Sequence, residues 1–169
     1  MEKDIFVPGR TELAGNHTDH QKGRILASAV DLGLFASFRD NGGNICHIDS
    51  EGFPEIEVRI SQLNIRPAEF GTSMALVRGV LAAFQELGLN IGGFDAQVRS
   101  SLPAGSGLSS SAAFAVLIGR ILSELFNGGK VEPSAGQGSS AGGKPVFRQA
   151  LRPHEPAHLR LRSYSICGL

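Results

Sequence analysis

The feature that most constrains the fold is the stretch over residues 102–126, LPAGSGLSSSAAFAVLIGRILSELF, in which a loop rich in glycine and serine runs directly into an apolar segment. The apolar part has hydrophobic residues on nearly every side of a helix, which is typical of a helix buried at the centre of a domain. The preceding residues 94–100 alternate, with Phe94, Ala96 and Val98 in step, as a half-buried strand does. The sequence therefore predicts a strand, a tight loop and a central helix in succession.

Two further segments have the pattern of strands. Residues 25–38 are apolar and rich enough in β-forming residues for one or two strands. Residues 55–61 alternate, with Ile56, Val58 and Ile60 on one face, which predicts a half-buried strand.

An amphipathic helix is expected over residues 72–87. Apolar residues recur there at spacings of three and four, with Arg78 and Gln85 off the apolar stripe. Gly88 follows at the position where glycine commonly ends a helix. Strands with helices packed against them predict an α+β fold.

The amino-acid composition and the periodicity of the sequence change after Pro133. The next residues are rich in glycine and serine, and the last 22 carry four arginines against one acid with no sustained period. Such a segment resembles neither a strand nor a helix. We predict one domain over residues 1–133 and an aberrant or disordered, irregular tail over residues 134–169.

Composition narrows the choice of partner and compartment. The 16 basic and 16 acidic residues cancel, which gives no electrostatic reason to expect nucleic acid or an anionic membrane as partner. Two cysteines, Cys46 and Cys167, cannot form a disulfide framework and fit a reducing cytoplasm. The first residues lack an apolar core of signal-peptide length, so we expect a cytoplasmic protein that binds small ligands, with its oligomeric state left open.

The loop over residues 102–113 has the chemistry of a phosphate site. Gly105 and Gly107 let the backbone turn tightly, and Ser109 begins the region where a helix starts, so unpaired N–H groups and the positive end of the helix dipole converge. The alternative is a plain Gly/Ser linker, which the tight flanking by a strand and an apolar helix disfavours. The candidate cofactor-binding residues are Pro103, Gly105, Ser106, Gly107, Leu108, Ser109, Ser110 and Ser111.

A second candidate site lies near the N-terminus, in PGRTELAGNHTDH. This short, loop-like stretch is dense in hydrogen-bonding side chains, which favours a polar ligand. Two alternatives stay open: a metal site made by His17, Asp19 and His20, and a solvated surface turn. The polar residues of the stretch are Arg10, Glu12, Asn16, His17, Thr18, Asp19 and His20.

Both stretches resemble motifs of one family. GRTELAGNHTDH is similar to the galactokinase signature, and PAGSGLSSSAA resembles the phosphate motif of the GHMP kinases, of which galactokinases are one branch. The resemblance extends from Phe6 to about Pro133. It implies the N-terminal domain of a GHMP kinase, a ribosomal protein S5 domain 2-like fold, which is incomplete here. The His-Thr-Asp sequence disfavours the GHMP kinases that act on mevalonate or homoserine.

The resemblance also implies roles for individual residues. Arg10 matches a catalytic arginine between the sugar hydroxyl and the transferring phosphate, and Ser111 matches a hydroxyl ligand of Mg²⁺. The ATP phosphates would lie on the glycine-rich loop. Two positions depart from the family, because Asn16 replaces a sugar-binding glutamate and His20 replaces a tyrosine. The residues implied in sugar binding are Asn16, His17, Thr18 and Asp19.

The segment that carries the family's catalytic aspartate is not found in this chain. When the codons of residues 142–162 are read one base later, permitted codon choices spell AENRYFGKPCGLMNQLTCAYG, which resembles that segment with asparagine at the aspartate position. We therefore expect a tail translated out of frame, and apolar faces on the helices at residues 74–87 and 112–126 left uncovered. The resemblance implies ATP-dependent phosphorylation of galactose at its anomeric hydroxyl, with this chain an inactive piece. The alternative is a sensor that binds sugar and ATP without turnover.

Overall fold

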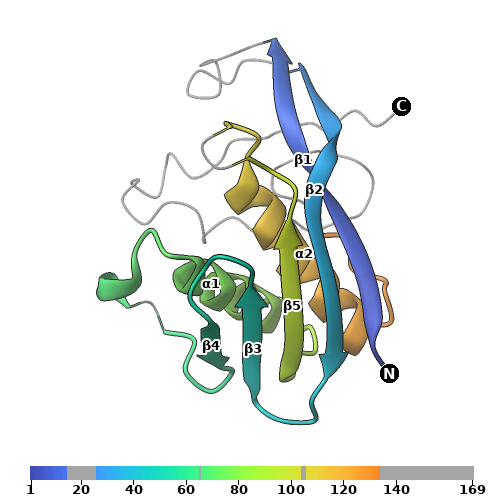
Figure 1. Cartoon of the computed structure of the whole chain (residues 1–169). Coiled ribbons are helices and arrows are strands. Elements are labelled where there is room, and N and C mark those ends of the chain that lie inside the picture. The colour runs from blue at the N-terminus through green and yellow to red at the C-terminus, as the bar shows by residue number, and fades with distance from the viewer. Residues whose placement is uncertain (15–25, 65, 104–105, 134–169) are drawn as a thin grey trace.

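The computed structural model describes residues 1–14, 26–64, 66–103 and 106–133. A five-stranded sheet has the order β1-β2-β5-β3-β4, and α1 and α2 cover one of its faces (Figure 1). The elements are β1 (Lys3–Ala14), β2 (Leu26–Asp40), β3 (Ile45–Ser50), β4 (Ile56–Arg59), the short helix η2 (Pro67–Glu69), α1 (Ser73–Glu86), β5 (Phe94–Ser100) and α2 (Ser110–Phe126). The expected α+β fold is confirmed.

The sheet is mixed, because β3 and β5 are parallel whereas the other neighbouring strands are antiparallel. β1 and β2 are the longest strands, and they extend past the others at the top of Figure 1. Their register shifts twice, between Pro8 and Arg10 and between Glu12 and Ala14. Such irregularities re-aim the side chains of a strand, and the first one falls just before Arg10.

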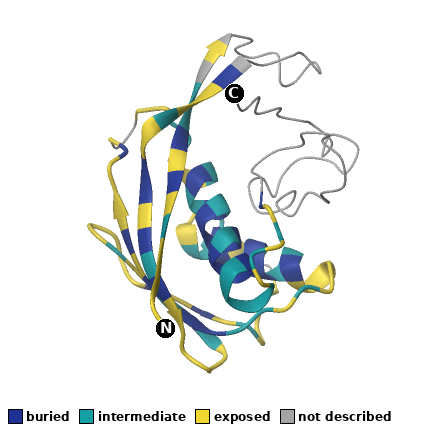
Figure 2. Ribbon diagram, turned by 90° about the vertical axis from the view of Figure 1, so that its right-hand side faces the viewer, coloured by how far each residue is buried: buried dark blue, intermediate teal, exposed yellow. Residues whose placement is uncertain are grey.

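The core lies between the sheet and the two helices, as the buried residues of Figure 2 show. Alternate residues of β2 and β5 point into it, while α2 has buried side chains on most of its circumference because it lies centrally over the sheet. The largest fully buried side chains include Phe38, Phe84, Phe94, Ile48, Leu81, Leu117, Ile118, Ile121 and Leu122. The central, buried helix predicted from the sequence is therefore confirmed.

The sequence located α1 to within a residue or two. Its side-chain cap is Thr72, whose hydroxyl accepts the N–H of Ala75 at 3.2 Å. At the other end the Leu89 N–H donates to Phe84 O, and Gly88 has φ +70°, the left-handed conformation of a Schellman motif. Gly88 therefore ends the helix as expected.

One residue of α1 differs from expectation. The apolar spacing predicts Arg78 off the buried stripe, yet this residue is only 4% exposed. Its guanidinium donates to both carboxylate oxygens of Glu69, at 2.9 and 3.1 Å, and to the Gln62 carbonyl. Arg78 thereby ties the segment after β4 to α1, a contact between separate elements that apolar periodicity does not predict.

The predicted exposure of the helix faces is wrong for the described residues. Of the exposed large apolar side chains in this part of the chain, only Leu87, the residue after α1, falls in either predicted range. The others are Met1, Phe6, Leu13, Leu32, Phe35 and Phe53. The described helices also include none that is both long and apolar enough to cross a membrane. The expected tail, residues 134–169, lies outside the described residues.

Candidate functional site

The two motifs singled out in the sequence meet where β1 passes the loop before α2. Gly9 makes this approach possible, because a Cβ at that position would lie 2.6 Å from Leu102 Cδ2 and 3.2 Å from the Leu108 carbonyl oxygen. The next residue, Arg10, donates its backbone N–H to that same Leu108 carbonyl at 3.2 Å. β1 therefore supports the loop directly by its backbone.

The side chain of Arg10 also reaches the loop. Its Nη2 donates to the Ser109 hydroxyl at 3.3 Å, across 99 residues of sequence. Arg10 is half-buried, whereas Ser110 and Ser111 on the first turn of α2 are exposed. A permanent positive charge is thereby held beside a surface that a ligand can reach.

The loop itself is built from left-handed residues. Gly107 has φ +71° and Ser109 has φ 58°, and α2 begins at Ser110. Ala113 donates its N–H to the Ser109 carbonyl at 3.0 Å, so the N–H groups of residues 110–112 come before the first bond of the helical ladder. These N–H groups and the helix dipole attract an anion, and the Arg10 guanidinium adds to that attraction.

The other end of the loop is anchored to β2. The Gly33 N–H donates to the Ser101 hydroxyl at 2.9 Å, and the Ser101 N–H donates back to the Gly33 carbonyl at 3.0 Å. Within the loop, the Ser106 N–H donates to the Pro103 carbonyl at 3.2 Å. Both flanks of the loop are thus fixed on the sheet, which preorganises the amide groups between them.

Several predicted site residues cannot be placed in this geometry. Asn16, His17, Thr18, Asp19, His20 and Gly105 lie outside the described residues. The structure therefore brings together Arg10, Leu108 and Ser109, with Ser110 and Ser111 on the adjoining turn. Among the described residues there is no group of three potential metal ligands, and the metal alternative for the N-terminal stretch concerns residues outside that part of the chain.

Sequence reasoning missed two residues of this site, Gly9 and Leu102. Gly9 provides the close approach, and Leu102, which is buried, lies against it. A glycine directly before the candidate arginine was visible in the sequence as a signal. The role of this glycine depends on which backbone segment packs against it, and only the tertiary structure shows that segment.

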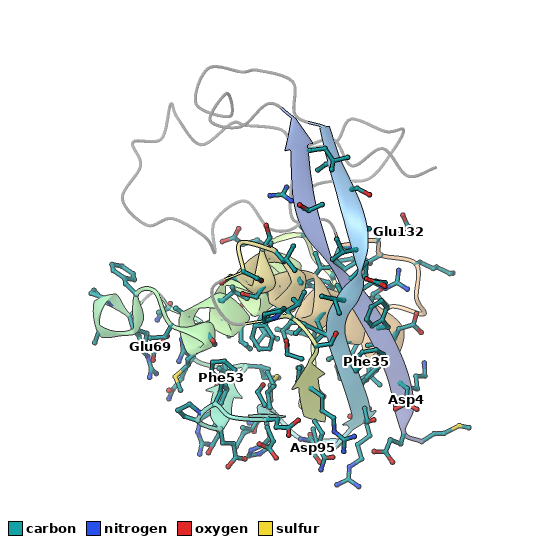
Figure 3. The ribbon with its side chains drawn as sticks, turned by 45° about the horizontal axis from the view of Figure 1, so that its top comes forward. Asp4, Phe35, Phe53, Glu69, Asp95 and Glu132 are labelled. Atoms are coloured by element: carbon teal, nitrogen blue, oxygen red, sulfur yellow. The ribbon has the colours of Figure 1, made fainter. Side chains whose placement is uncertain are left out.

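A hollow of about 420 Å³ lies elsewhere, on the sheet face that the helices leave open. It is lined by polar side chains of β2, β3 and β5, among them Arg39, His47 and Asp95. The Asn41 amide and the Arg39 guanidinium hold the pKa of the Asp95 carboxyl below its ordinary value. Asp95 lies at the start of β5, whereas the loop follows its end, so this hollow is separate from the Arg10 contact (Figure 3).

Comparison with known proteins identifies both motifs. Residues 4–40 match the galactokinase galactose-binding signature, and residues 75–134 match the GHMP kinases N-terminal domain. A galactokinase of Lacticaseibacillus casei is 33% identical over 130 residues, 76% of this chain and 34% of that protein. A galactokinase of Streptococcus mutans is 36% identical over 127 residues, 73% of this chain and 32% of that protein.

Solved structures give the same result. A Lactococcus lactis galactokinase complexed with galactose has a TM-score of 0.67 and 30% identity, covering 75% of this chain and 33% of that one. A Methanococcus jannaschii mevalonate kinase, at 20% identity and a TM-score of 0.60, covers 73% of this chain and 40% of its own and shows the shared fold alone. The chain spans about a third of the length of the curated galactokinases that it matches. It belongs to the GHMP kinases and carries the N-terminal region of a galactokinase.

Proposed function

We propose that this chain is the part of a galactokinase that gathers galactose and the phosphates of ATP. The observation that carries the proposal is the 3.3 Å contact between Arg10 and Ser109, because it joins the strand within the galactose-binding signature to the loop of the GHMP domain. A sugar held at the first motif would then face phosphates held at the second. That juxtaposition is what transfer of the γ-phosphate to the anomeric hydroxyl needs.

The described residues suit a triphosphate. Phosphate oxygens would accept from the N–H groups of Ser110 and Ser111, which are exposed and precede the helical ladder. Arg10 would stabilise the negative charge that develops as the phosphoryl group moves. Mg²⁺ binds few protein ligands and keeps waters and phosphate oxygens, so the exposed Ser111 hydroxyl fits its needs without a carboxylate cluster. The ion would neutralise charge on the transferring group.

The galactose side of the proposal rests on the matched signature. We propose that Asn16, His17, Thr18 and Asp19 bind the sugar hydroxyls, with Asp19 accepting hydrogen bonds from them. Asn16, an amide in place of the family's carboxylate, can also donate, so it would alter which hydroxyls are preferred. We propose that the protein acts in the cytoplasm, where ATP is available to bind.

Turnover is a separate question from binding. The family's catalytic aspartate lies in a segment that this chain lacks, so we propose that the 169-residue chain binds without transferring phosphate. The second candidate function is a sensor, which the neutral Asn16 and the asparagine spelled in the alternative reading frame favour. The protein expressed from a gene in which that frame is restored would distinguish a kinase from a sensor. Release of ADP that depends on galactose indicates a kinase, whereas binding of both ligands without release indicates a sensor.

The match to the GHMP domain stops at residue 134, which supports a domain boundary near Pro133. We propose that residues 134–169 are translated from a shifted frame. The nucleotide sequence from codon 130 onward tests this directly: the shifted frame should stay open and encode a segment like that of the galactokinases. An early stop in that frame would contradict the proposal.

Calorimetric titration of the 169-residue chain tests the binding function. We expect binding of Mg·ATP and of galactose, and a loss of Mg·ATP affinity of about tenfold or more in Arg10→Gln, because a hydrogen bond to a charged group contributes about 1.5–3 kcal/mol. Arg39→Gln is the matched control, since Arg39 is an exposed arginine paired with Asp95 on the other sheet face. Equal losses in both variants, or no binding by the unaltered chain, would refute the proposed function.

A further inference from the structure

We infer that Ser109 is a positioning residue whose hydroxyl holds the Arg10 guanidinium beside the first turn of α2. The inference rests on the proposed function, because it concerns how the Arg10 guanidinium is positioned before a phosphate binds. Ser109 would then matter for its side chain as well as for the amide that it contributes to the loop.

The backbone of Ser109 is unusual for a residue with a side chain. With φ 58° and ψ 43°, it is the one residue other than glycine, in the part of the chain that the structure describes, with a positive φ. A serine before a helix ordinarily has an extended backbone, and its hydroxyl caps an N–H of the first turn. The Ser109 side chain makes no such cap. Its hydroxyl is therefore directed to another partner.

That partner is Arg10. The guanidinium donates from Nη2 to the Ser109 Oγ at 3.3 Å, while the Arg10 backbone N–H donates to the Leu108 carbonyl at 3.2 Å. Two neighbouring loop residues thus hold one arginine, one by its backbone and one by its side chain. Gly9 permits the approach, since a Cβ there would lie 3.2 Å from the Leu108 carbonyl oxygen.

The same conformation shapes the amide groups. A left-handed residue followed by a helical one turns successive N–H groups toward one point, the arrangement called a nest, which binds anions. Ser109 and Ser110 have that order, because α2 begins at Ser110. Ser109 therefore both orients the backbone N–H groups and holds the Arg10 guanidinium. A phosphate that binds here would meet donors that are already oriented.

Glycine would adopt this backbone conformation more readily than serine. A serine at a position that favours glycine suggests that the side chain is used. Substitution by glycine therefore distinguishes two roles for Ser109. If only its backbone conformation matters, Ser109→Gly should bind Mg·ATP at least as tightly as the unaltered chain, whereas if its hydroxyl oxygen matters, the affinity should fall. Asparagine tolerates the left-handed region and retains a side-chain oxygen that can accept from Arg10.

The experiment measures affinity for Mg·ATP and for inorganic tripolyphosphate by calorimetry, using the 169-residue chain. We expect Ser109→Gly to weaken binding about fivefold, the effect of losing one ordinary hydrogen bond. Ser109→Asn should return affinity to within about twofold of the unaltered chain if its oxygen replaces the hydroxyl. In an Arg10→Gln background, Ser109→Gly should have almost no further effect, because coupled residues are not additive. Affinity equal to or above that of the unaltered chain in Ser109→Gly, or independent losses in the double variant, would overturn the inference.

A second readout does not depend on the proposed function. In the absence of ligand, the ¹⁵N signal of the Arg10 guanidinium should shift in Ser109→Gly and remain near its original position in Ser109→Asn. An unchanged signal in Ser109→Gly would overturn the inference even if the chain binds Mg·ATP. If the signal shifts but the unaltered chain binds neither probe, the contact exists while the proposed function fails, and the positioning role fails with it.

Discussion

Gly9 lies where β1 crosses the loop before α2, and its lack of a side chain sets the distance between them. A Cβ there would lie 2.6 Å from the movable Leu102 side chain, but also 3.2 and 3.3 Å from the backbone oxygens of Leu108 and Leu32. The side chain can move aside, whereas the two carbonyls require a shift of a strand or the loop. The spacing at this one residue therefore affects both stability and the proposed phosphate site.

We predict that Gly9→Ala lowers the free energy of unfolding by about 1–3 kcal/mol, the usual effect of overpacking, and also weakens Mg·ATP binding. Urea unfolding and calorimetry measure the two effects. Gly42→Ala is the control, because Gly42 has φ +66° and nothing within 4 Å of its Cβ position. It should destabilise through backbone strain and leave affinity unchanged. A Gly9→Ala chain with undiminished Mg·ATP affinity would contradict the prediction.

Cys46 on β3 should resist alkylation in the folded chain. Its side chain is fully buried, and burial raises the pKa of its thiol to about 12. Below that pH the thiolate, which is the reactive form, is scarce as well as inaccessible. Iodoacetamide labelling at pH 8, read by peptide mass spectrometry so that Cys167 is scored separately, should modify Cys46 only on unfolding. Labelling at the rate of a free thiol would show that β3 is not held in the core.

At the scale of elements, the pair formed by Glu69 and Arg78 joins η2 to α1. The hydrogen bond from Arg78 is the main cause that holds the pKa of the Glu69 carboxyl below its ordinary value, and the charges of Arg78 and Arg66 act in the same direction. A carboxyl whose pKa is lower in the folded than in the unfolded chain stabilises the fold when it is ionised. The contribution is present above the ordinary pKa and is lost as the pH falls toward and below the folded pKa.

We predict that Glu69→Gln destabilises the chain by about 2 kcal/mol near pH 7, because it leaves the buried Arg78 without its charge partner. The difference between the variant and the unaltered chain should shrink as the pH falls below the ordinary glutamate pKa of about 4.3, toward the lower pKa of the folded chain. Urea midpoints across that range measure it. Glu57→Gln is the control, since the Glu57 side chain is 53% exposed and its nearest ionic partner is 3.9 Å away. A difference that stays constant with pH would refute the role of the pair.

Elements with a regular pattern could be predicted from the sequence, and irregular ones could not. The α1 and β5 boundaries followed from apolar spacing and from Gly88. The polar side chains and Pro8 around Arg10 indicate a loop. In the structure, the described part of that stretch, up to Ala14, belongs to β1, which pairs with β2 despite two register shifts. β3 was missed as well, because only Cys46 and Ile48 in this short strand are buried.

At the scale of the whole molecule, the sequence predicted that the two motifs lie together but not how they join. The resemblance to galactokinases placed Arg10 and the glycine-rich loop in one site, and the structure puts Arg10 against Ser109. The close approach at Gly9 and the left-handed serine both depend on packing between residues about 100 positions apart. Periodicity and composition describe neighbours in sequence, so they have no access to such contacts.

The buried apolar residues form one cluster that includes the sheet and both helices. One continuous core predicts a single cooperative transition, in which helices and sheet unfold together. Leu117→Ala should move that transition as a whole, because Leu117 is fully buried in α2 and its truncation typically costs about 2–5 kcal/mol. Phe53→Ala, at a residue 67% exposed, should change stability by less than about 0.5 kcal/mol.

Since the sequence contains no tryptophan, helical circular dichroism and the methyl NMR signals of Val58 and Val98 provide the two probes. Coincident urea curves in the unaltered chain, shifted equally in Leu117→Ala, are the expected result. If the helical signal is lost before the methyl signals of β4 and β5, then α2 is held by something other than this core. The cluster would then not be the unit that brings Arg10 and the loop together, and the site would have to be completed by residues beyond it.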